Sequence, residues 1–380
     1  MMGGVPNPTK DVLLAMHEGP YILHARGGEL RKVPVEKSRL PIDGLPFAHQ
    51  RINMAMASDG TIYFPHLGMM SRSTDGGRTW SVNERGVGPD GEQTWLRFQV
   101  LNDGTFVTTG SQNEGSVVKI YASSDEGRTW QLISQIEVPG EFQKFTETYP
   151  NIGVLGLVYR GINDELVCMI NAHTNEHGKD WSWVSGEPTL LSYRSTDKGI
   201  TWQSPSKIMN WACGEGGVAR APSGRLLLAI RYQRPMLPGD PPDLIERTGA
   251  ARIDAKFPYK HLFLVDSLDD GHSWQNPRQL TTVFGQCYGY PVALNDSSVV
   301  VIHTTPYGPG ERGSRAMISH DEGRTWGNET YYMTFSTESG YNQSVALKDG
   351  TILTISARDD TDPYTVIRWK PVTGTGTVRR

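Results

Sequence analysis

Arginine, glutamate and tyrosine recur at equivalent places in a repeated pattern along this chain. Eight residues before four of the short polar turns lie Arg51, Glu215, Tyr288 and Tyr341. The turn after Glu215 is followed by a further segment, and Arg231 lies at the end of that segment. A guanidinium forms charge-assisted hydrogen bonds with an anion, and a carboxylate can take the proton of a neighbouring phenol. If the fold brings these positions together, they predict a polar binding site that can do chemistry.

The polar turns define the repeat. Six hairpins resemble the form apolar-x-x-Asp-Gly-x-apolar, and their alternation and turn residues are typical of antiparallel β-structure. The turns are centred on Asp59-Gly60, Asp103-Gly104, Asn163-Asp164, Ser223-Gly224, Asp296-Ser297 and Asp349-Gly350.

An eight-residue motif follows each of the first five hairpins, with the pattern S-x-D-x-G-x-[TS]-W, and we call it the box. Its short Asp side chain can accept hydrogen bonds from the amides of its own turn, its Gly allows an unusual backbone angle, and its Trp offers an apolar face. Because five copies cannot all face one substrate, we interpret the five Asp residues as structural. The boxes span residues 73–80, 123–130, 195–202, 267–274 and 319–326.

Six hairpins predict six blades of four strands each, in an all-β chain. The sixth blade has no box, so we predict its third strand at residues 364–369 and its fourth at residues 21–35, which would close the ring. Residues 1–380 would then form a single domain. The first strands of a propeller line its central channel, so the residues eight positions before each turn are expected to converge there.

The box resembles the Asp-box of the sialidase (neuraminidase) superfamily, and this resemblance covers nearly the whole chain. It implies a six-bladed β-propeller of the sialidase type. It also implies that Arg51, Arg231 and Arg312 form the arginine triad that binds a substrate carboxylate, with Arg315 as a competitor for the third place. Three guanidinium groups around one carboxylate would select an acidic sugar.

The resemblance further implies that Tyr341 is the nucleophile and Glu215 the carboxylate paired with it. A phenol has a pKa near 10, so a neighbouring carboxylate has to take its proton. The family's acid Asp is missing, because residues 64–72 contain no carboxylate. His66 in this segment, or Asp43 just before the first blade, could protonate the leaving group. The missing Asp is equally consistent with a reaction that needs no strong acid and with a loss of catalysis.

These features predict an exo-acting glycoside hydrolase that removes a terminal carboxylate-bearing sugar, such as sialic acid, from a glycan. Neither a cofactor nor a metal is expected. One alternative is a propeller enzyme with different chemistry on acidic glycans, such as elimination from a uronic acid. Another is a glycan-binding propeller without catalysis.

Composition restricts the class of partner. A formal net charge of -4 gives no basic field for nucleic acid, and no apolar run is long enough to span a bilayer. The chain starts without a signal-peptide pattern, so we expect a cytoplasmic protein or an already trimmed secreted or periplasmic form. Cys168, Cys213 and Cys287 lie far apart in the sequence and are expected to be buried free thiols.

Two insertions interrupt the repeat, at residues 173–187 and 234–259. Long loops on one rim of a scaffold commonly carry specificity, so these segments are expected to shape the substrate pocket. Contact with a second subunit, in a homo-oligomer, is the alternative role.

Overall fold

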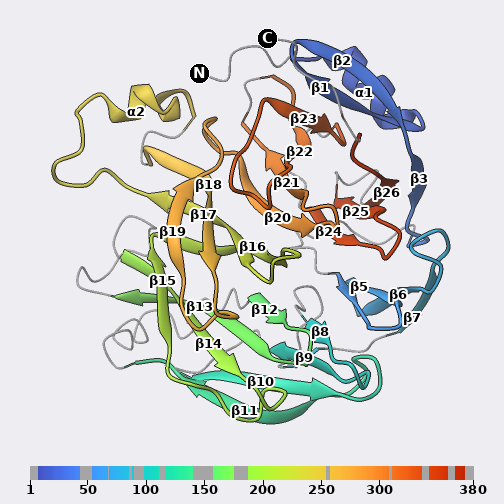
Figure 1. The fold of residues 1–380 in the computed structure, drawn as a ribbon, viewed down its shortest axis with the longest axis vertical. Helices are drawn as coiled ribbons and strands as arrows, with labels where there is room; N and C mark the ends of the chain where they lie inside the picture. Colours follow the sequence, from blue (N-terminus) through green and yellow to red (C-terminus); the bar gives the residue numbers. More distant parts are fainter. Residues whose placement is uncertain are drawn as a thin grey trace.

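The computed structural model contains six antiparallel sheets arranged around a central axis (Figure 1). It describes residues 7–42, 54–66, 68–84, 88–89, 98–110, 117–139, 157–174, 187–253, 257–307, 310–335, 342–357 and 364–372. Each sheet is one blade, numbered here from the first box. In blades 1 to 5 the four blade strands follow one another along the chain, whereas blade 6 takes its fourth strand from the N-terminal region. The prediction of an all-β, six-bladed propeller is confirmed.

Within each blade the first strand lies at the axis and the fourth strand lies on the outside. The inner strands are β4 (Ala55–Met56), β8 (Phe98–Val100), β12 (Leu157–Arg160), β16 (Ala212–Arg220), β20 (Cys287–Ala293) and β24 (Asn342–Ala346). The second strands are β5 (Ile62–His66), β9 (Phe106–Thr109), β13 (Leu166–Thr174), β17 (Leu226–Arg234), β21 (Val299–Thr305) and β25 (Ile352–Ala357). The third strands are β6 (Met69–Ser73), β10 (Val117–Ser123), β14 (Glu187–Ser195), β18 (Tyr259–Ser267), β22 (Gly313–Ser319) and β26 (Tyr364–Trp369). The outer strands are β7 (Ser81–Glu84), β11 (Gln131–Glu137), β15 (Ser206–Asn210), β19 (Gln275–Gln279), β23 (Glu329–Tyr332) and β3 (Glu36–Arg39).

The predicted turns join the first and second strands of the blades. In each of the six turns the second residue has a left-handed backbone, with φ from 64° at Asp164 to 91° at Gly60. Glycine reaches this region without a steric cost, and glycine holds the position in four of the six turns. At the first turn Asp59 also accepts a hydrogen bond from the Thr61 amide, at 2.8 Å. These turns fix where each inner strand ends and the second strand begins.

The Asp carboxylates of the boxes accept hydrogen bonds from their own turns. In the first box, Asp75 accepts hydrogen bonds from the Thr79 amide at 2.9 Å and from the Thr79 hydroxyl at 2.6 Å. The Gly77 amide donates to the Ser73 hydroxyl at 2.8 Å. The other four boxes repeat these contacts. The structural interpretation of the five Asp residues is therefore confirmed.

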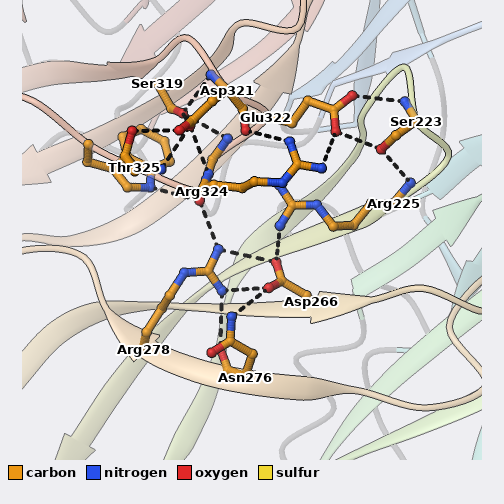
Figure 2. A network of polar contacts seen from close by, with 12 residues as sticks. Ser223, Arg225, Asp266, Asn276, Arg278, Ser319, Asp321, Glu322, Arg324 and Thr325 are labelled. Carbon is orange, nitrogen blue, oxygen red and sulfur yellow. Dashed lines mark hydrogen bonds and ion pairs between the residues drawn. The ribbon is translucent and has the colours of Figure 1, made fainter.

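In the third and fifth boxes the residue after the Asp also joins neighbouring blades. Lys198 of blade 3 donates to Asp103 of blade 2 at 2.7 Å, and Glu322 of blade 5 accepts from the Ser223 amide of blade 4 at 2.9 Å. Figure 2 shows that the Glu322 contact belongs to a polar network between blades 4 and 5. In this network Asp266 is paired with Arg225 at 2.9 Å. The boxes thus connect the blades as well as closing their hairpins.

Apolar side chains fill the space between blades. Between blades 2 and 3, for example, Val118 and Ile120 of β10 pack in one cluster with Leu166 and Ile170 of β13. Cys168 belongs to the same cluster. Cys168 and Cys287 are buried free thiols, as expected, and the Cys213 side chain lies outside the described part of the structure.

The N-terminal prediction needs a correction. β26 is the third strand of blade 6, as predicted, but its partner is β3, at 36–39, and not the segment 21–35. Residues of that segment form a hairpin of β1 (Tyr21–Arg26) and β2 (Glu29–Pro34), and β1 pairs with β23 at the edge of blade 5. Helix α1 (Lys10–Glu18) packs on this hairpin through Leu13 and Met16. Figure 1 shows the helix and hairpin outside the ring. The hairpin is more apolar than β3: Leu23 and Ala25 of β1 pack with α1, and Ile22 packs with side chains of blades 5 and 6.

The second insertion projects from blade 4 in Figure 1 and contains α2 (Leu244–Arg247) and η3 (Ala250–Arg252). Its base is held by Arg234, which donates to Asp240 at 2.9 Å and lies 4.5 Å from the ring centre of Tyr259. Most of the first insertion, 175–186, lies outside the described residues. None of the helices in the described chain is long and apolar enough to cross a membrane.

Candidate active site

The inner strands converge on a cavity of about 230 Å³ along the axis. All six contribute to its wall, which confirms that the inner strands share one channel. Its polar lining includes Gln99 of β8, Arg160 of β12 and Gln343 of β24. Gly216 of β16 also lines the cavity, and Glu215 directly precedes it in the chain.

Two irregular strand pairings occur on successive blades, near the start of their inner strands. The pairing of β16 with β17 shifts between Cys213 and Gly216, and the pairing of β20 with β21 shifts between Cys287 and Tyr290. Glu215 therefore lies inside the first bulge and Tyr288 inside the second. Bulges reorient side chains and are common near active sites. Here they explain why Glu215 and Tyr288 leave the regular alternation of their strands.

Gly216 permits the first bulge. A Cβ atom at this position would lie 2.0 Å from the carbonyl oxygen of Ala229, which is far inside van der Waals contact. Only glycine therefore fits here without a shift of the backbone. Close backbone approach at Gly216 holds Glu215 against β17, the strand that carries Arg231.

Arg231 is the centre of the described polar contacts. Its Nη1 donates to the carboxylate of Glu215 and, at 3.3 Å, to the hydroxyl of Tyr288. Its Nε donates to the side-chain oxygen of Gln233 at 2.9 Å. Glu215 is 3% exposed, Arg231 6%, Gln233 4% and Tyr288 9%. The guanidinium thus has a buried anionic partner and two neutral partners.

Glu215 and Arg231 form a buried ion pair. Removing one member would leave the other charge buried and unpaired, which is strongly unfavourable. Counting from the hairpin turns placed Glu215 and Arg231 in neighbouring strands of one blade, and the structure brings these two residues together. Arg51 and Tyr341 lie outside the described residues, as does Asp43.

The two candidates for the third arginine differ in their surroundings. Arg312 is exposed, on the connection from β21 to β22. Arg315 is buried and donates to the backbone carbonyls of Glu311, Ser314 and Thr334 at 2.8, 3.0 and 3.3 Å. Burial lowers the pKa of Arg315 to about 10. Arg315 thus holds the backbone of this blade, and Arg312 is the better candidate for contact with a substrate.

His66 lies at the end of β5, nearly fully buried. Its Nδ1 lies 2.6 Å from the hydroxyl of Tyr364, and burial lowers the pKa of His66 to about 4. At neutral pH this imidazole is therefore uncharged, which disfavours it as a general acid there. His303 is similar: burial lowers its pKa to about 4, and its Nδ1 lies 3.2 Å from the carbonyl of Thr304. The side chain of His173 lies outside the described part.

Sequence reasoning assigned no role to Gln233 or Trp211. Gln233 lies two residues after Arg231, so strand alternation places both on one face of β17, and this spacing could have identified it. Trp211 precedes β16 with a left-handed φ of 59°, and its carbonyl accepts from the Gln233 amide at 3.0 Å. Its backbone angle could not be read from the sequence. No group of three or more His, Cys, Asp or Glu side chains among the described residues could hold a metal ion.

Neither a known protein family nor a curated protein matches this sequence. Solved structures share its fold. A Dyadobacter fermentans protein of unknown function is 17% identical, with a TM-score of 0.58 over 89% of this chain and 97% of its own. A Penicillium chrysogenum α-L-arabinanase, solved with arabinobiose, is 15% identical, with a TM-score of 0.55 over 84% of this chain and 93% of its own. A Hadza microbial sialidase is 16% identical, with a TM-score of 0.55 over 92% of this chain and 73% of its own. The chain has the six-bladed β-propeller fold of the sialidase type.

Proposed function

We propose that this propeller is a glycoside hydrolase that removes a terminal sugar bearing a carboxylate, such as sialic acid, from a glycan. The observation that carries the proposal is the buried pair of Glu215 and Arg231, in which Glu215 directly precedes the cavity-lining Gly216. A carboxylate and a guanidinium in this position can activate a nucleophile and bind an anion. Solved propellers of similar fold include a sialidase and an arabinanase, which supports hydrolysis of glycosides.

In the proposed reaction the phenol oxygen of Tyr341 attacks the anomeric carbon while Glu215 accepts the phenol proton. The bond from that carbon to the leaving-group oxygen breaks, and this oxygen takes a proton. Water then attacks the same carbon, gives its proton back to the group that protonated the leaving-group oxygen, and releases Tyr341, which recovers its proton from Glu215. Two displacements retain the configuration of the sugar. Arg51, Arg231 and Arg312 hold the carboxylate, and an uncharged phenol avoids repulsion from it.

His66 is the proposed donor of the leaving-group proton. Because its pKa is about 4, it carries that proton only in acidic solution. The proposal therefore includes an acidic pH optimum on substrates with poor leaving groups. An aryl leaving group needs little protonation, so hydrolysis of an aryl glycoside should not share this requirement.

A second candidate is a glycosidase for an uncharged sugar. The observation that favours it is that Glu215 already balances the charge of Arg231, while Gln233 and Tyr288 accept from the same guanidinium. In this case Arg231 would orient Glu215 and would not bind a carboxylate. The arabinanase neighbour, solved with arabinobiose, makes an arabinoside the first substrate of this kind to test.

The test compares hydrolysis of 4-methylumbelliferyl α-sialoside and 4-methylumbelliferyl α-L-arabinofuranoside by the wild type and by Tyr341→Phe, Glu215→Gln and Arg231→Lys. Asp197→Asn, in a box far from the site, serves as a matched control for loss of a carboxylate. We expect sialoside hydrolysis to fall by about a hundredfold or more in the three site variants and to persist in the control.

Three different results would each point to a different function. Hydrolysis of the arabinofuranoside alone would replace the acidic sugar by an uncharged one. An ultraviolet-absorbing unsaturated product from a uronic-acid glycan would indicate elimination. Binding of free sialic acid without turnover of any of these substrates would indicate a glycan-binding propeller.

A further inference from the structure

Tyr288 shares one nitrogen atom of Arg231 with Glu215. Both the Glu215 carboxylate and the Tyr288 hydroxyl accept from Nη1, and the Tyr288 ring centre lies 5.6 Å from the guanidinium carbon. On the other side of the guanidinium, the side-chain oxygen of Gln233 accepts a hydrogen bond from Nε. The guanidinium is therefore held from two sides, by blade 4 and by blade 5. Tyr288 is the contact that comes from the neighbouring blade.

The backbone places this phenol at a conformational cost. Tyr288 has a φ of 57°, in the left-handed region that residues with a Cβ atom adopt reluctantly. Most of the other non-glycine residues with such angles in the described chain lie in boxes or hairpin turns. Tyr288 lies in neither, but in the bulge of β20. Strained residues persist where the surrounding structure enforces them, and they concentrate at functional sites.

The packing around the bulge enforces this conformation. The next residue, Gly289, is so close to β18 that a Cβ atom there would lie 2.7 Å from the side chain of Leu262. Leu262 is the cross-strand partner of Arg231. The same contact between blades thus supports the bulge of Tyr288 and the strand that carries Arg231.

The proposed chemistry gives this arrangement a purpose. When Glu215 takes the proton of Tyr341, it loses its charge and binds the guanidinium less strongly. The Tyr288 hydroxyl keeps its place as an acceptor throughout this step. Arg231 then remains oriented toward the substrate carboxylate while its ionic partner is neutral.

We propose that Tyr288 is a positioning residue of this site, which acts through Arg231 and keeps the guanidinium aligned for an anionic substrate. The inference rests on the proposed function for its kinetic effect, but the placement of Arg231 can be examined without a substrate. No contact of Tyr288 with the reacting atoms is implied.

The test uses Tyr288→Phe, which keeps the ring and removes the hydroxyl. Tyr232→Phe is the matched control, because Tyr232 is next to Arg231 on β17 but faces the other side. With 4-methylumbelliferyl α-sialoside we expect KM to rise about tenfold in Tyr288→Phe and kcat to fall as well, because the contact with Arg231 is lost both when the substrate binds and while Glu215 is neutral. The control should keep both constants. A crystal structure of Tyr288→Phe should show Arg231 displaced.

Two results would overturn the inference: an unchanged KM, or an Arg231 side chain that stays in place. A purely structural role would instead lower the melting temperature and reduce kcat without a change of KM. If the wild type does not hydrolyse the sialoside, the proposed function fails. The position of Arg231 in crystals of Tyr288→Phe then tests the positioning role of Tyr288 independently of the proposed function.

Discussion

The ring Nε2 of His24 lies 2.8 Å from a carboxylate oxygen of Glu329, and this contact fastens the N-terminal hairpin to blade 5. His320 lies 3.3 Å from the other oxygen, and the Tyr331 hydroxyl donates to Glu329 at 3.1 Å. Burial by itself would raise the pKa of Glu329, but the hydrogen bonds from His24, His320 and Tyr331 outweigh it and lower the pKa to about 2. The hairpin is thus attached through an ionised carboxylate.

Glu329→Gln should lower the free energy of unfolding at pH 7 by about 1–3 kcal/mol, because a buried ionic contact is lost. The folded-state pKa of Glu329 lies below its ordinary value of 4.5, so its stabilising contribution is complete above pH 4.5 and disappears as the pH falls toward 2. Urea unfolding of both proteins at pH 7, 5 and 3 measures this. A difference that stays constant down to pH 3 would contradict the assigned contact.

Glu322→Ala and Lys198→Ala should differ although both residues hold the same position in a box. Glu322 is 5% exposed and accepts from the amide and the hydroxyl of Ser223, so its loss should cost about 1–3 kcal/mol. The Lys198 side chain is 50% exposed in its pair with Asp103, so its loss should have little measurable effect. Equal effects in denaturant unfolding would show that burial does not decide how strongly a box joins its neighbour.

Mild acid should destabilise the propeller through its buried histidines. Burial lowers the pKa values of His66, His261 and His303 to about 4, from an ordinary value of 6.5. The unfolded chain therefore takes up protons first, and stability that is complete above pH 6.5 is lost as the pH falls from 6.5 to 4. Each histidine should contribute a loss of the order of 1–3 kcal/mol.

His261→Leu should flatten this dependence in melting experiments between pH 7.5 and 4.5. His272→Gln, which alters an exposed histidine, should leave the slope unchanged. Identical slopes for His261→Leu and the wild type would refute the assignment to buried imidazoles.

Gly216→Ala and Gly217→Ala should differ in stability and activity, because Gly216 lies at the bulge of β16 and Gly217 lies in the regular part of the strand. A Cβ atom at Gly216 would meet the Ala229 carbonyl at 2.0 Å, whereas one at Gly217 would lie 3.2 Å from the side chains of Tyr290 and Pro291. We expect Gly216→Ala to lose about 3 kcal/mol or more of stability and most of the glycosidase activity, since the backbone has to shift beside Glu215. Gly217→Ala should lose less of both. The reverse order would mean that the bulge does not position Glu215.

The fold could be predicted because its signals are local. Each box combines an Asp, a Gly and a Trp at fixed spacing, and each hairpin turn needs residues that tolerate a left-handed angle. Counting from these turns also placed Glu215 near Arg231. Such patterns depend on hydrogen bonds within a few residues, so they can be read without knowledge of the rest of the chain.

Contacts between distant segments could not be predicted in this way. Residues 36–39 carry no apolar pattern, so the sequence favours the more apolar segment at 21–35 as the closing strand. The low pKa of His66 follows from burial by other blades, and the bulge at Tyr288 follows from packing of Gly289 on Leu262. No local signal encodes these relationships, since they exist only once the ring has formed.

The pairing of β3 with β26 has a consequence for synthesis. These strands lie near opposite ends of the chain, so on the ribosome β3 has to wait for most of the protein before its partner emerges, which takes tens of seconds at ordinary rates of elongation. During that time β3 has no partner, and an unpaired strand is the kind of surface that promotes aggregation. The nascent propeller is therefore most vulnerable just before its final blade is complete, and this is the stage at which a chaperone would help it most.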